Sequence, residues 1–240
     1  RGAEVGSTEL IKEAAKKYNR NIEEIELKSQ FRCNGSDNYL DWLEYVLGHS
    51  DEEKILKKGD NFDFKIFNSP NELHAMIKEK NSQKGITARM VAGYCWNWST
   101  KLNENGELEK DVKIGDFEMP WETHGDIRPP EGYVKWYEWA YKPEGIKQVG
   151  CIYTAQGFEF DYIGVIVGPD IRYDEKNDCL VGDIKGTSDP MLKRSKNKFD
   201  EYVRNIYRVL MSRGMKGCYV YFVDKKVEKY FKSMIEKTKG

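Results

Sequence analysis

Three short segments of this sequence carry residue types that suit contact with the phosphates of a nucleotide. They are residues 29–32, 153–161 and 207–214, of which the first ends in Arg32 and the third contains Arg213. Arginine presents a planar fork of donors that pairs with two phosphate oxygens, whereas lysine is a point charge. The middle segment holds a glycine, which lets a main chain approach a ligand closely. Together the segments look like part of a phosphate-binding site.

The part that would hold the phosphates themselves is missing from the sequence. No stretch of the 240 residues fits the pattern G-x-x-x-x-G-K-[ST]. That pattern supplies a main-chain cradle, a lysine for the phosphates and a hydroxyl for Mg²⁺. We therefore expect that this chain alone does not hydrolyse ATP and that its three segments form the other half of such a site.

The order and character of the three segments resemble motifs IV, V and VI of the second RecA-like domain in superfamily 1 helicases. Longer blocks are similar to a bacterial family related to the Schlafen group 3 DNA/RNA helicase domain, namely residues 30–37, 91–96, 150–168 and 204–221. The resemblance implies a three-layer α/β fold of the RecA-like (P-loop NTPase) type with a largely parallel sheet. It also implies that residues 1–240 form a single C-terminal helicase domain, with an insertion at about 96–146.

The resemblance assigns the two arginines to catalysis. In helicases of this class, ATP and Mg²⁺ lie between two RecA-like domains, and the second domain sends arginines across the cleft. Arg213 matches the motif VI arginine, an arginine finger, and fingers of this kind accelerate phosphoryl transfer by roughly 10³ to 10⁵. Arg32 matches the motif IV arginine and is expected to reach the same phosphate, and Gln30 of the same motif is expected to contact the nucleotide.

The resemblance also assigns roles within motif V. Gly157 permits close main-chain approach, and Glu159 would accept a hydrogen bond from the ribose or orient the loop. Thr154 and Gln156 would couple the nucleotide cleft to single-stranded DNA or RNA. Many superfamily 1 enzymes have lysine at the position of Gln156, and an amide offers only neutral hydrogen bonds there.

Simpler structural roles compete with these assignments. Arg213 precedes a glycine at the expected end of a helix, where a cation complements the helix dipole. Arg32 could form an ordinary surface ion pair. Glu159 and Asp161 flank a turn, so either could cap it.

The tryptophans also allow two interpretations. Five of the six lie between positions 96 and 139. Trp96 and Trp98 could stack on single-stranded bases, which is worth about 1 to 3 kcal/mol per base, or the group could pack into a satellite core within the insertion. The lysine-rich residues 185–198 are either a phosphate-tracking loop or a solvated one.

The remaining pattern alternates strands with helices, as a sheet covered on both faces requires. We expect residues 22–31 to be extended and residues 170–183 to form a hairpin. Cys151 and Cys218 should be buried within strands. The expected helices begin near 8, 36, 70, 199 and 225, and the expected strands cover 62–66, 88–94, 149–153, 163–167 and 218–223.

Composition limits the partners of the chain. Its 39 Lys and Arg residues nearly balance 40 Asp and Glu residues, so any nucleic-acid contact must be a local patch. No apolar run approaches the ~20 residues of a membrane span. Five scattered cysteines and three histidines do not predict a zinc site or disulfide framework. The first residues contain neither Met nor a signal segment, which suggests a piece of a longer cytoplasmic protein.

These observations predict the C-terminal half of an ATP-dependent DNA or RNA helicase or translocase. Its partners would be an upstream RecA-like P-loop domain of the same protein and a single strand of DNA or RNA, with no membrane. A non-catalytic module that keeps the fold to bind nucleic acid or protein is the first alternative. The second is an unrelated small-molecule enzyme that uses Glu159, Asp161 and the basic loop.

Overall fold

The computed structural model describes residues 8–23, 33, 36–57 and 61–237. It divides into two compact units, residues 1–30 and residues 31–240. The described part of the first unit contains helix α1 (Thr8–Lys17), on which Leu10 and Ile11 are exposed. The second unit holds the segments 153–161 and 207–214, whereas the segment 29–32 spans the boundary between the units. Gln30 and Arg32 lie outside the described residues.

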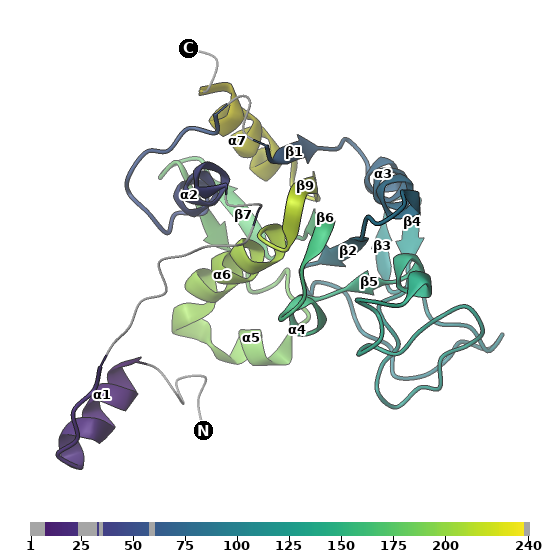
Figure 1. Ribbon diagram of the computed structural model, residues 1–240, viewed down its shortest axis with the longest axis horizontal. Coiled ribbons are helices and arrows are strands. Elements are labelled where there is room, and N and C mark those ends of the chain that lie inside the picture. Colours follow the sequence, from purple (N-terminus) through teal and green to yellow (C-terminus); the bar gives the residue numbers. More distant parts are fainter. Residues whose placement is uncertain (1–7, 24–32, 34–35, 58–60, 238–240) are drawn as a thin grey trace. The chain divides into compact units, whose positions relative to one another are not determined.

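A five-stranded, fully parallel sheet forms the centre of the second unit (Figure 1). Its β6 register pairs Ile163 with both Arg89 and Cys218. In spatial order the strands are β1 (Asp63–Ile66), β9 (Gly214–Phe222), β6 (Phe160–Val167), β2 (Ala88–Ala92) and β5 (Val149–Gly150).

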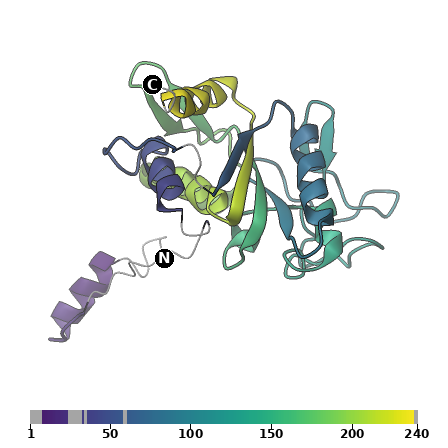
Figure 2. The ribbon, with the colours of Figure 1, turned by 45° about the horizontal axis from the view of Figure 1, so that its top comes forward.

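Successive side chains of the central strands enter two different cores because strand residues alternate between the faces of a sheet. Cys218 and Val220 of β9 join one core, whereas Tyr219 and Tyr221 join the other. The first core is completed by α2 (Asp37–Val46), α6 (Phe199–Met211) and α7 (Lys225–Glu236), and the second by α3 (Pro70–Ser82) and part of the insertion. Figure 2 shows α3 across the sheet from α2 and α6. The predicted three-layer, RecA-like fold is confirmed.

Capping residues set the starts of three helices, as the sequence predicts. Ser36 accepts a hydrogen bond from the main-chain N–H of Tyr39 (3.2 Å), and Asp224 does the same for Lys226 (2.8 Å). Ser69 caps α3 from the position before Pro70. Each cap satisfies an N–H that the helix itself leaves unpaired.

The insertion is continuous with the core of the sheet. Its hairpin of β3 (Val112–Ile114) and β4 (Phe117–Met119) packs with Met90 and Ile166 of the sheet, and Trp139 packs in the opposite core. The satellite core that the sequence suggested is therefore wrong as a separate cluster, although most of the insertion's aromatic rings do pack.

Buried Arg89 of β2 anchors the insertion. Its guanidinium donates to the carbonyl oxygens of Trp139 (2.8 Å) and Lys142 (2.6 Å) and to Oδ1 of Asn81 (2.9 Å). Burial lowers its pKa to about 10, so the group stays charged at neutral pH. Main-chain oxygens thus accept hydrogen bonds from a buried cation and fix the loop at 139–142.

Two expectations about the chain after the insertion are wrong. The strand predicted over 149–153 is shortened to β5, because helix α4 (Ile152–Ala155) begins two residues after Gly150. Cys151 is the N-terminal cap of α4, so it is buried but does not lie in a strand. A Cβ on Gly150 would lie 2.4 Å from the ring of Trp139. Residues 185–198 are not one loop, since they contain α5 (Pro190–Arg194), which Asp189 caps, and a 3₁₀ turn, η3 (Lys196–Lys198).

The predicted hairpin after β6 is confirmed as β7 (Ile171–Asp174) and β8 (Cys179–Gly182), which pair antiparallel. A 3₁₀ turn, η2 (Pro143–Lys147), leads into β5. Within the described ranges, no helix has both the length and the apolar character to cross a bilayer. Nor do the described residues gather three or more His, Cys, Asp or Glu side chains suited to a metal ion.

Candidate functional site

Motifs V and VI meet where β6 and β9 begin. The main-chain N–H of Phe160 donates to the carbonyl of Arg213 at 2.9 Å. In return, the Arg213 guanidinium donates from Nη1 to the carbonyl of Phe158 (3.4 Å) and from Nε to that of Val209 (3.0 Å). Two segments far apart in the sequence therefore form one junction at this edge of the sheet.

Arg213 is buried at this junction, with 3% of its surface exposed. The two acceptors named above are main-chain oxygens, which satisfy the charge without neutralising it. A phosphate from outside the unit would reach the guanidinium only after the side chain turns outward. The Arg213 side chain therefore lies packed beside the motif V loop and does not extend into solvent.

The motif V loop is exposed beside that arginine. Gly157 has φ +95°, a conformation that side-chain-bearing residues rarely adopt, and nothing lies within 4 Å of the position a Cβ would take. Gln156 and Glu159 on either side of Gly157 and Phe158 are also exposed. The loop thus offers main chain and two polar side chains to a ligand.

Two residues that follow motif IV in the sequence contact the residues directly before Arg213. Sγ of Cys33 is 3.9 Å from the carbonyl of Ser212, and the hydroxyl of Tyr39 donates to the carbonyl of Met211 at 3.1 Å. Cys33 and Tyr39 therefore connect this part of the chain to the end of α6. In sequence, Arg32 is the neighbour of Cys33.

Thr154 points into the protein. It is 5% exposed, and its hydroxyl accepts from the N–H of Cys151 (3.0 Å) and donates to Oε1 of Glu122 (2.8 Å). Thr154 is therefore not placed to touch a nucleic-acid strand in this arrangement, and its side-chain contact leads to Glu122 of the insertion.

Glu122 is a buried carboxylic acid that the sequence did not single out. Its residue is fully buried, and Oε2 has no hydrogen-bond partner among the described residues. Burial raises the pKa of Glu122 to about 7, while hydrogen bonds from Thr154 and Cys151 oppose the rise. The spacing of residues around Glu122 gave no signal, because its partner Thr154 is remote in the sequence.

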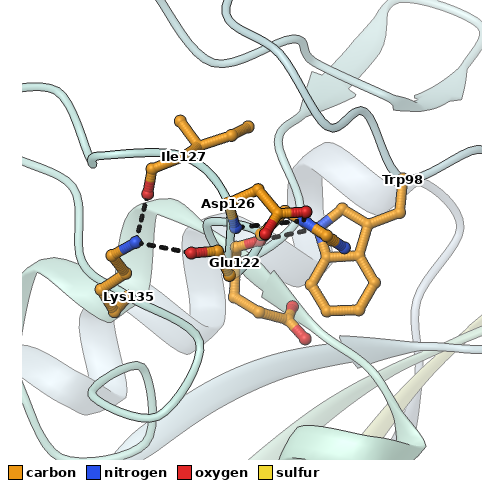
Figure 3. A network of polar contacts seen from close by, with 7 residues as sticks. Trp98, Glu122, Asp126, Ile127 and Lys135 are labelled. Carbon is orange, nitrogen blue, oxygen red and sulfur yellow. Dashed lines mark hydrogen bonds and ion pairs between the residues drawn. The ribbon is translucent and has the colours of Figure 1, made fainter.

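The main chain around Glu122 is held by the insertion. Nε1 of Trp98 donates to the Glu122 carbonyl at 2.8 Å, and Lys135 donates to the carbonyls of Ile127 and Gly125 (Figure 3). In that view the Glu122 carboxylate is turned away from Lys135. The carboxylate therefore gains no ion pair from that lysine.

Trp96 and Trp98 are half-buried, and both indole groups are engaged. Nε1 of Trp96 donates to the carbonyl of Lys113 at 3.0 Å, and its ring lies 6.4 Å from that of Trp121. The ring of Trp98 meets Tyr94 edge to face at 6.1 Å. Both tryptophans thus have a packing role, and the exposed part of each ring remains available to a ligand.

Asp161 has a structural role. Its Oδ2 accepts from the main-chain N–H (2.8 Å) and the hydroxyl (3.1 Å) of Thr87, and Oδ1 pairs with Lys216 at 2.9 Å. These contacts join β6 to the start of β2 and to β9. Asp161 therefore has a structural role, but it bridges strands and does not cap the turn as the sequence had suggested.

Two comparisons relate this chain to known proteins. Residues 1–224 match the family described as "Schlafen group 3, DNA/RNA helicase domain". An uncharacterized protein of Saccharomyces cerevisiae is 32% identical in an alignment of 220 residues that covers 82% of this chain and 45% of the yeast protein. The chain thus spans less than half the length of that relative.

Proposed function

This chain belongs to the Schlafen group 3 DNA/RNA helicase domain family, and from that premise we propose that it supplies the C-terminal half of an ATP-dependent helicase or translocase. In this proposal an upstream RecA-like P-loop domain of the same protein holds ATP and Mg²⁺. The present chain closes over the nucleotide and moves along single-stranded DNA or RNA. Nucleic-acid binding then depends on a local surface, because the net charge is only −1.

The junction of Arg213 with Phe158 is the observation that carries the proposal. It joins motif VI to the motif V loop, in which Gly157 and Glu159 are exposed. We assign Arg213 as the arginine finger, which turns out of its main-chain contacts when the cleft closes. Arg32 and Gln30 act on the same nucleotide from motif IV.

Helix α4 supplies a path from this junction to the strand. Cys151 precedes the helix and Gln156 of the motif V loop follows it. Thr154 of the helix contacts Glu122 of the insertion. Tyr153 donates to Oδ2 of Asp189 at 2.6 Å. A shift of the motif V loop on ATP binding would therefore move contacts on two elements at once, and this is the coupling role we propose for Thr154 and Gln156.

One observation favours a second candidate. Arg213 is 3% exposed and already bonded to carbonyl oxygens, as a residue with a purely structural role would be. A non-catalytic module that retains the fold for binding nucleic acid or protein would need no movement of this side chain.

An ATPase assay distinguishes the two candidates. The chain joined to its P-loop domain should hydrolyse ATP faster when single-stranded DNA or RNA is added, and the chain alone should not hydrolyse ATP. If neither nucleic acid changes the rate of ATP hydrolysis by the joined protein, the motor proposal is contradicted. If the upstream part of the full-length protein has no phosphate-binding motif, the non-catalytic module is favoured.

A further inference from the structure

A hollow of about 580 Å³ opens at the carboxyl end of β2. Such a volume lies within the usual range for small-molecule sites. Its lining includes Tyr94, which follows β2, and Asn97, Trp98, Lys101 and Glu109 of the insertion. Ser188 and Pro190 complete it from the segment before and within α5. None of the roles proposed above uses this hollow as a site.

The hollow lies at a switch point of the sheet. After Ala92 the chain leaves β2 for its neighbour β5, whereas after Val167 it leaves β6 for β9 on the opposite side. Adjacent strands whose connections diverge leave a crevice at their carboxyl ends, where open α/β sheets bind ligands. The position of the hollow is thus one that the topology favours for binding.

Hydrogen bonds hold the two walls of the hollow together. The carbonyl of Tyr94 accepts from the N–H of Ser188 (2.7 Å) and from the hydroxyl of Thr187 (3.1 Å). The Ser188 hydroxyl donates to the carbonyl of Cys95 at 3.0 Å. The insertion and the loop before α5 are therefore one fixed surface, so a ligand would meet a preformed site.

The lining suits a flat, polar, aromatic ligand. The rings of Tyr94 and Trp98 stand at 86° to each other, and the hydrogen bond from Trp98 to Glu122 fixes one of them. Asn97 offers an amide that can both donate and accept. Lys101 and Glu109 contribute one positive and one negative charge, so the lining has no excess of positive charge that would select a ligand by its phosphates.

From this geometry we propose that the hollow binds an unstacked nucleobase of the single strand. Aromatic rings stack on any base, and an amide or carboxylate reads its polar edge. Lys101, exposed at the rim, is placed to meet the adjoining phosphate. The inference rests on the proposed function, since it names how the strand is held, and it gives the insertion a role in substrate recognition.

Filling the hollow tests the inference. Thr100 lines the hollow and is exposed, so Thr100→Trp adds a ring there without disturbing the core, and Thr100→Ala is the matched control. Binding of a fluorescent oligothymidylate and of the same strand lacking its bases is measured by anisotropy. Thr100→Trp should weaken binding of the base-bearing strand at least about fivefold and leave the abasic strand unchanged.

A second pair of variants does not depend on tolerating a large side chain. Asn97→Ala should change the ratio of affinities for strands of different bases, whereas Asn105→Ala, at an exposed turn of the insertion, should not. Equal binding by both Thr100 variants, with unchanged ratios for Asn97→Ala, would overturn the inference. Binding of free thymidine monophosphate without binding of the strand would also overturn it.

The experiment separates this inference from the motor proposal. Equal binding of the base-bearing strand by Thr100→Trp and Thr100→Ala, together with strand-stimulated ATP turnover, removes the pocket and keeps the motor. Weaker binding of the base-bearing strand alone by Thr100→Trp, without stimulated turnover, keeps the pocket and removes the motor.

Discussion

The carbonyl oxygen of Phe158 accepts a hydrogen bond from the guanidinium of Arg213, 3.4 Å away across 55 positions of sequence. The main chains of the two segments are also bonded, through the N–H of Phe160 and the carbonyl of Arg213. A movement of the Arg213 side chain therefore releases an acceptor in the motif V loop. This coupling makes the junction suited to sensing a nucleotide, because the arginine and the loop must rearrange together.

Replacing Arg213 tests its assignment as the finger. In the chain joined to its P-loop domain, Arg213→Ala should lower kcat for ATP by roughly 10³-fold or more and leave KM nearly unchanged. The reason is that the guanidinium stabilises charge that develops only in the transition state. Steady-state ATPase kinetics measure both constants.

Arg208 is the matched control for that substitution. It lies on α6, which ends at Met211 just before Arg213, and it pairs with Glu44 at the surface. Arg208→Ala should leave kcat within about twofold of the unchanged protein, since an exposed ion pair contributes at most about 1 kcal/mol. If both variants lose activity equally, or Arg213→Ala keeps full turnover, Arg213 is a structural residue.

Glu122 predicts a pH dependence of stability. Its pKa is about 7 in the folded protein and 4.5 ordinarily, so between these values the folded state binds more protons than the unfolded state. Its contribution to stability is therefore fully present below pH 4.5 and is lost as the pH rises through 7. Glu122→Gln should reduce the loss of unfolding free energy between pH 5 and 8 by about 2 to 3 kcal/mol.

The comparison of variants isolates Glu122 from other titrating groups. Buried Asp170, whose pKa is raised by burial to about 6, changes stability in the same direction but is present in both proteins. Glu104→Gln, on an exposed turn of the insertion, is the control. Denaturant unfolding at each pH provides the free energies, and an unchanged pH slope in Glu122→Gln would contradict the prediction.

The sequence predicts the regular elements well because their signals are local. Ser69 and Pro70 mark the start of α3, and alternation or continuous apolar runs mark the strands. The start of α4 was missed because Gly150, the last residue of β5, packs against the ring of Trp139, a contact that the residues of 149–155 alone do not reveal. Tertiary contacts of this kind override local preference.

For the candidate site, too, local signals were read from the sequence and tertiary contacts were not. Order and residue type select the two segments assigned to motifs V and VI. That assignment stays a prediction, and the structure brings Phe158 and Arg213 of these segments together. Neither Glu122 nor Arg89 was singled out, since the importance of each arises from burial beside partners that no spacing rule connects. The sequence also did not predict the burial of Arg213, because an arginine at the end of a helix is exposed in most proteins.

Arg89 predicts a large effect on stability. Arg89→Met removes hydrogen bonds to the carbonyls of Trp139 and Lys142. The Trp139 oxygen loses its guanidinium donor, whereas the Lys142 oxygen keeps the main-chain N–H of Gly145 at 3.0 Å. The unfolding free energy should fall by about 2 to 4 kcal/mol. Arg172→Met, at an exposed ion pair with Asp183, should cost less than about 1 kcal/mol. Equal losses in the two variants would show that Arg89 does not anchor the insertion.

Trp96 and Trp98 should separate stability from strand binding. Trp96 packs on Trp121 and bonds to β3, whereas Trp98 lines the hollow beside Tyr94. Each Trp→Phe change removes one indole hydrogen bond and should lower the unfolding free energy by about 1 to 2 kcal/mol. Only Trp98→Phe should also weaken binding of a base-bearing single strand, because its ring alone faces the proposed base. Thermal unfolding and anisotropy titration of the two variants measure these effects, and equal strand affinities would place both tryptophans in packing only.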